Sequence, residues 1–178
     1  MWREGKENCV ALPEDDIDIV QKYIHYIYTQ KLPVLADHDT VQIQSHENHP
    51  EYFVLADLYI FGENIRDSGF KNRIIDAFIS RVESKVRNAT RCYPHSAVVD
   101  RIYRGTMEGS LARKLMLDAR IGAGHETWIT TDAADHNKEF LSDLSRGLLC
   151  SRRRTRKSDF FGDWFDCLEY YEGEEGEY

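Results

Sequence analysis

The sequence lacks long hydrophobic runs, closely spaced cysteines and glycine-rich loops. Its apolar stretches fall well short of the roughly 18 residues that a membrane-spanning helix needs. The N-terminus, MWREGKEN, has no apolar signal core. We therefore expect an intracellular protein, cytoplasmic or nuclear, without a membrane segment.

The four cysteines of this 178-residue chain are widely separated and form no Cys-x-x-Cys pair. Structural thiols in a reducing compartment are the favoured interpretation, and a disulfide or zinc framework is the alternative. The cysteines are Cys9, Cys92, Cys150 and Cys167.

Residue types that could carry out chemistry do not form a recognisable site. The glycines match neither a dinucleotide-binding nor a P-loop spacing, and no serine lies in a nucleophile elbow. His46 and His49 could share a face near Asp37, His38 and Asp39 as a metal site. No cysteine pair or fixed spacing completes such a site, so a solvated loop is favoured. We predict a non-enzymatic protein with no cofactor and no metal.

Two further histidines have structural interpretations. His25 lies in an otherwise apolar helical pattern, and we predict that it is packed or at a helix edge. His136, with Asp132 and Asp135, is predicted to take part in helix capping.

The net charge of −8 is unevenly distributed. Residues 151–157 carry five positive charges and no negative one, and residues 158–178 carry eight negative charges and no positive one. The acidic tail can neutralise the basic run, and no reading helix accompanies it, so we do not expect nucleic-acid binding. By composition the basic run matches a nuclear localisation signal, with a solvated hinge as the alternative. Its charged residues are Arg152, Arg153, Arg154, Arg156 and Lys157.

Hydrophobic periodicity predicts a mainly α-helical chain with one short strand, at residues 9–12, that has no evident partner. Loops are expected at residues 34–49 and 125–135. The first helices are expected at residues 13–29, at 49–86 with a break at 67–69, and at 94–105. The next begins at a cap on Ser110 and ends just before Gly122 and Gly124. The last begins at a cap on Asp135 or Asn137 and ends at 149.

The two helices between residues 49 and 86 form the part around which the chain is organised. Asp67 and Ser68 in the short break can both accept hydrogen bonds from free amides of the second helix. Two helices joined so tightly pack as a hairpin. The apolar stripes are Phe53, Val54, Leu58, Phe61 and Ile65, followed by Phe70, Ile74, Ile75, Phe78, Ile79, Val82 and Val86.

The other helices carry their own apolar stripes. In the first, one face holds Ile17, Val20, Ile24, Ile27 and Tyr28, with Tyr23 beside them. The later stripes are Ala97, Val98, Ile102 and Tyr103; Leu111, Leu115, Met116 and Ala119; and Phe140, Leu141, Leu144, Leu148 and Leu149.

Two motifs follow each other in a recognisable order. An acidic helix start after a short strand leads to a helix that ends in Tyr-Ile-Tyr-Thr, and a Leu-Ala-Asp-Leu-Tyr helix then pairs with a further helix. Together they resemble the second half of a BTB/POZ domain of the type found in fungal proteins, over about residues 7–87. The matching residues are Leu12, Glu14, Asp15, Asp16, Tyr26, Tyr28, Thr29, Leu55, Ala56, Leu58, Tyr59 and Asn72.

The resemblance implies a partial BTB/POZ domain at 7–90, a C-terminal helical extension at 91–150 and a flexible tail at 151–178. The strands and helical hairpin that open this family's domain, and that supply most of its dimer interface, do not precede residue 9. A truncated product is therefore expected, and homodimerisation is in doubt. We also expect the first strand and first helix to expose part of their apolar faces, which would promote self-association.

The same resemblance implies a protein-interaction module, with a substrate adaptor for a cullin ubiquitin ligase as a specific role. In that role Trp2-Arg3-Glu4 and the acidic-start helix would contact the cullin. The alternatives are a nuclear regulatory protein that tethers a transcription or chromatin partner, and a non-functional truncated product. The implied partner-binding residues are Trp2, Glu4, Asp15, Asp16 and Tyr28.

Overall fold

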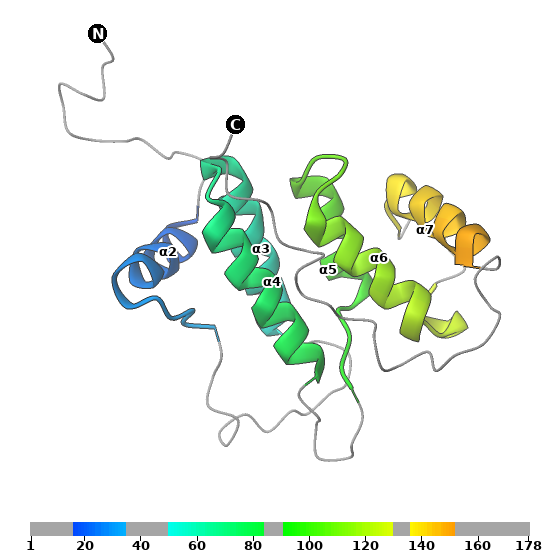
Figure 1. Ribbon diagram of the computed structural model, residues 1–178, viewed down its shortest axis with the longest axis horizontal. Helices are drawn as coiled ribbons and strands as arrows, with labels where there is room; N and C mark the ends of the chain where they lie inside the picture. Colours follow the sequence, from blue (N-terminus) through cyan, green and yellow to red (C-terminus); the bar gives the residue numbers. More distant parts are fainter. Residues whose placement is uncertain (1–15, 35–49, 84–90, 130–135, 152–178) are drawn as a thin grey trace, which may run out of the picture.

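The computed structural model describes residues 16–34, 50–83, 91–129 and 136–151, and within these ranges every regular element is a helix. The helices lie side by side, from α2 at one end to α7 at the other (Figure 1). The mainly α-helical prediction is confirmed, whereas the predicted strand at residues 9–12 lies outside the described ranges. The helices are α2 (Ile17–Thr29), α3 (Pro50–Ile65), α4 (Ser68–Glu83), α5 (Ser96–Gly105), α6 (Leu111–Ala123), the short 3-10 helix η1 (Glu126–Trp128) and α7 (Lys138–Ser151).

Helix α3 is contacted by three other helices, α2, α4 and α5. The single apolar stripe predicted for this helix contains too few of its buried residues. A helix contacted from several sides buries residues around most of its circumference. Phe53, Val54 and Ile65 are only partly buried. The fully buried set is Tyr52, Leu55, Ala56, Leu58, Tyr59, Phe61 and Gly62.

The predicted hairpin of α3 and α4 is confirmed, and the two helices pack closely. Asp67 accepts a hydrogen bond from the Phe70 amide at 2.8 Å and so caps α4. Ser68, expected to share this role, is instead the first residue of α4. Gly62 makes the close approach possible, because a Cβ there would lie 2.9 Å from Cγ of Lys71.

The apolar stripe of α4 is confirmed at every position that the structure describes. The buried residues include Phe70, Ile74, Ile75, Phe78, Ile79 and Val82, and Val86 lies outside the described ranges. Two ionic side chains are buried with them. Lys71 pairs with Glu63 at 2.8 Å, and Arg81 pairs with Glu51 at 2.5 Å.

The ends of the later helices differ slightly from the prediction. Helix α5 begins at Ser96, with His95 as its N-cap, and not at Pro94. In α6, Gly122 is still helical and Gly124 is the C-cap. Asn137 caps α7, because its side-chain oxygen accepts from the Glu139 amide at 2.8 Å.

One hydrophobic core runs through the described helices, from Ile19 of α2 to Leu144 of α7. In the helices that follow α4, three residues expected in the apolar stripes are exposed instead: Ala97 in α5, and Leu148 and Leu149 at the end of α7. In the described part of the chain, no helix covers these two leucines of the last turn of α7.

Candidate interaction surface

Helix α2 is a well-delimited helix at one end of the stack. Asp16 caps its start by accepting from the Asp18 amide at 2.9 Å, which satisfies one of the free amides of the first turn. Gln30 ends it in the left-handed region, with φ of 57°, and donates its backbone amide to the Tyr26 carbonyl. These caps fix where the helix begins and ends.

The inner face of α2 is held by an aromatic cluster. Tyr23 lies edge-on against Phe61, with ring centroids 5.2 Å apart, and against Phe70 at 4.8 Å. Tyr26 contacts the same Phe70 ring at 4.9 Å. With Ile19, which is buried, these side chains attach α2 to the α3–α4 hairpin.

A hydrogen bond reinforces this attachment at the edge of the cluster. The Tyr23 hydroxyl donates to Oδ2 of Asp67 at 3.0 Å, so the residue that caps α4 also holds α2. Burial, and then the contact with Asp67, raise the pKa of Tyr23 to about 12. The phenol therefore stays protonated at neutral pH and keeps this bond.

The side of α2 that points away from the core is apolar and exposed. We call its four exposed residues, Ile17, Ile24, Ile27 and Tyr28, the outer face of α2. Their exposed fractions are 73%, 46%, 48% and 84%. An exposed isoleucine is common on a protein surface, but four large apolar side chains along one short helix form a contiguous patch.

The expected exposure of the first helix is thus confirmed, but the sequence interpretation missed its buried side. Tyr23, expected beside the apolar stripe, faces the core, and Ile19 and Tyr26 join it there. Their spacing of four and then three residues was a readable signal. This spacing was hard to recognise in the sequence, because the outer stripe of α2 has the same helical period and contains more aliphatic residues.

Of the residues that the resemblance assigned to partner binding, Asp16 and Tyr28 lie in the described ranges. Trp2, Glu4 and Asp15 lie outside the described ranges. Asp16 is occupied as the N-cap, and Tyr28 is free at the surface. The basic residues Arg152, Arg153, Arg154, Arg156 and Lys157 also lie outside the described ranges, as do His46 and His49.

The histidines in the described ranges match the expectations only in part. His25 is exposed, which agrees with the predicted position at a helix edge and not with the alternative of a packed histidine. His136 is buried just before α7, whereas Asn137 provides the capping oxygen. His95 and His125, which the sequence did not single out, each accept a backbone amide at a helix start.

An open groove of about 470 Å³ lies between α3 and α5. Its walls carry two ion pairs, Asp57 with Arg101 at 2.5 Å and Arg104 with Asp100 at 2.9 Å. Burial raises the pKa of Asp57, against the lowering effect of Arg101. These four charges pair with each other, so the ion pairs leave no net charge on the groove walls to select a ligand.

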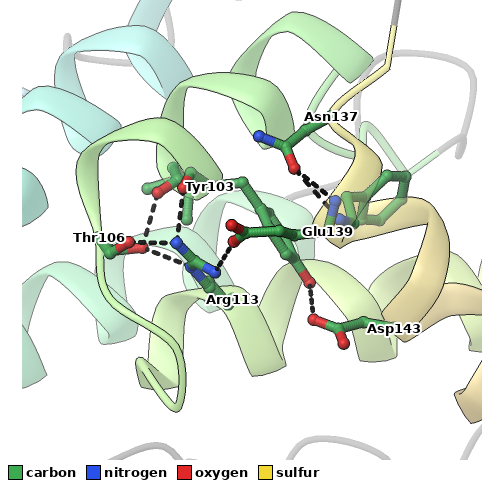
Figure 2. A network of polar contacts seen from close by, with 8 residues as sticks. Tyr103, Thr106, Arg113, Asn137, Glu139 and Asp143 are labelled. Carbon is green, nitrogen blue, oxygen red and sulfur yellow. Dashed lines mark hydrogen bonds and ion pairs between the residues drawn. The ribbon is translucent and has the colours of Figure 1, made fainter.

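The most elaborate polar cluster joins α5, α6 and α7 around buried Arg113 (Figure 2). Its guanidinium donates to the carbonyl oxygens of Tyr103 and Thr106, to the Thr106 hydroxyl at 3.1 Å and to Glu139 at 2.6 Å. The same group lies 4.7 Å from the centre of the Tyr103 ring. All these contacts join residues of this chain to one another, so the cluster stabilises the packing of α5, α6 and α7. We call the cluster around Arg113 the polar joint.

The described ranges contain no group of three or more His, Cys, Asp or Glu side chains placed to hold a metal ion. Within the same ranges, no helix has the length and apolar content to cross a membrane. Among the described residues, the outer face of α2 is therefore the strongest candidate for a functional surface.

Comparisons with protein-family models, with curated proteins and with solved structures found no match to this chain.

Proposed function

We propose that this chain is a non-enzymatic protein–protein interaction module whose docking surface is the outer face of α2. The observation that carries the proposal is that α2 is apolar on two opposite sides while only one side is covered by the described helices. Contiguous exposed apolar patches on soluble proteins mark interaction sites.

The shape of the surface supports docking of another protein. A helix of 13 residues is about 20 Å long and presents a convex ridge of side chains, which fits a groove or another helix. Small-molecule sites are instead concave and mostly enclosed. Tyr28, the most exposed of the four, offers a large rigid anchor with a polar tip.

The specific role we propose is that of an adaptor for a cullin ubiquitin ligase, which rests on the BTB/POZ resemblance. That role places the acidic-start helix at the contact, and the exposed side of α2 leaves this helix accessible. Tyr28 would contact the cullin, whereas Asp16 would act indirectly, because it caps α2.

Binding of the full chain to a purified cullin tests this role. We expect Ile24→Asp and the pair Trp2→Ala with Glu4→Ala each to weaken binding at least about tenfold. The matched control is Ile129→Asp, since Ile129 is also 46% exposed but lies beyond η1, away from α2. Absence of binding by the unmodified chain would eliminate the cullin role.

A further inference from the structure

The outer side of α2 has the spacing of a helix–helix seam. Ile17, Val20, Ile24 and Ile27 follow one another at intervals of three, four and three residues, which are successive a and d positions of a heptad pattern. Val20, at the edge of the seam, is partly buried against the core, and the three isoleucines are exposed. A surface with this spacing is complementary to another helix.

The seam is also complementary to itself. In an antiparallel pair of α2 helices related by a two-fold axis, Ile17 of one copy faces Ile27 of the other, and Val20 faces Ile24. Every apolar side chain of the seam then meets an apolar partner. A two-fold contact uses the same patch on both copies, so the pattern of one helix specifies the whole interface.

The charges around the seam favour the antiparallel arrangement. Asp16 and Asp18 lie at the start of α2, and Lys31 follows its C-cap. Antiparallel packing brings the acidic end of each copy toward the lysine of the other and opposes the two helix dipoles favourably. Parallel packing would bring the acidic ends together.

Uncharged residues flank the solvent side of the seam. Gln21, in the middle of the helix, is exposed there, and Tyr28 extends the apolar surface near the end. Two copies could therefore approach without burying a formal charge, which is the most costly contribution to such a contact.

We propose that a second copy of this chain covers the outer face of α2, with the two α2 helices antiparallel about a two-fold axis. The inference rests on the docking surface of the proposed function, so a second copy and a cullin would compete for this surface and the cullin would bind the monomer. The contact between copies differs from the interface of the family that the chain resembles, which is built from the strands and helical hairpin that open that family's domain. A seam one helix long is smaller than a standard protein interface, so the dimer is weak and depends on concentration.

Sedimentation equilibrium of the full chain tests the proposal. The unmodified chain is expected to approach twice its monomer mass as concentration rises. Ile24→Asp is expected to raise the dimer dissociation constant at least about tenfold, because a charge would enter the apolar seam. Ile129→Asp, at equal exposure, is expected to leave it unchanged. A monomer at all concentrations, or equal effects of both substitutions, would overturn the proposal.

A pair of complementary substitutions tests the register. Ile17→Lys and Ile27→Asp each place a charge opposite an isoleucine, so each variant alone is expected to dimerise poorly. When the two variants are mixed, one lysine faces one aspartate across the seam, and dimer formation should recover. Both positions are well exposed, so folding is preserved, and circular dichroism verifies this. A parallel dimer places residue 17 opposite residue 17, so it would recover more when Ile17→Lys is mixed with Ile17→Asp than with Ile27→Asp, and that order would refute the antiparallel arrangement.

The two proposals fail in different ways. A chain that dimerises but does not bind the cullin even as a monomer would leave the self-association intact and eliminate the adaptor role. A monomer that binds the cullin through α2 would do the opposite.

Discussion

The two ends of the helical stack differ in what they present to solvent. At one end, the outer side of α2 carries three isoleucines and a tyrosine. At the other end, the exposed side chains of α7 are polar or charged as far as Arg146, and apolar side chains appear only in the last turn. Helix α7 thus resembles the terminal element of a stack, whereas α2 resembles an internal one whose outer side no described helix covers.

The two end helices are each attached by aromatic contacts and by one tyrosine–aspartate hydrogen bond. At α2 these are the contacts of Tyr23 and Tyr26 with Phe61 and Phe70, and the bond from Tyr23 to Asp67. The α7 end adds a polar joint, in which Arg113 connects α6 to Glu139 and Tyr103 donates to Asp143 at 3.2 Å (Figure 2). Aromatic packing is tolerant of small shifts, whereas the guanidinium joint depends on direction.

Phe70→Ala should produce the largest effect, because Phe70 is fully buried and contacts both tyrosines of α2. We expect the free energy of unfolding to fall by about 3–5 kcal/mol. Hydrogen exchange measured by residue should increase most in α2. The matched variant Phe140→Ala, at the other end, should increase exchange in α7 instead. If either variant increased hydrogen exchange equally in α2 and α7, the two ends of the stack would not be stabilised independently.

Arg113→Met should have the next largest effect. The substitution keeps an apolar stem of similar length but leaves the carbonyl oxygens of Tyr103 and Thr106 without their buried donor. We expect a loss of about 2–3 kcal/mol in urea unfolding. Arg104→Met is the control, since Arg104 forms an exposed pair with Asp100 and should change stability by less than about 0.5 kcal/mol. Similar losses in both variants would show that the joint contributes no more than a surface ion pair.

Tyr23→Phe should have the smallest effect, about 1 kcal/mol at neutral pH, because one hydrogen bond to Asp67 is lost while the ring remains. The pKa of Tyr23 is raised from 10.0 to about 12, so its contribution is complete below pH 10 and is lost as pH rises through about 12. The stability difference between the unmodified chain and the variant should therefore shrink over that range in urea titrations. A difference that stays constant to pH 12 would argue against the bond.

Much of the fold could be predicted because each signal is local. The break at Asp67, the period-3.6 stripe from Phe70 to Val82 and the capping oxygen of Asn137 act within one or two helical turns, and the structure confirms all three. The polar joint at Arg113 could not be predicted in this way. Its partners, Tyr103 and Glu139, lie 10 and 26 residues away along the chain.

The sequence by itself determined that the described chain is helical and where most of its helices begin and end. Only the tertiary structure decided which side of α2 is covered, because both sides have helical spacing. The aromatic rings of Phe61 and Phe70 fit against Tyr23 and Tyr26, which leaves the aliphatic stripe facing outward. Shape complementarity between distant segments made that choice, and periodicity alone does not contain it.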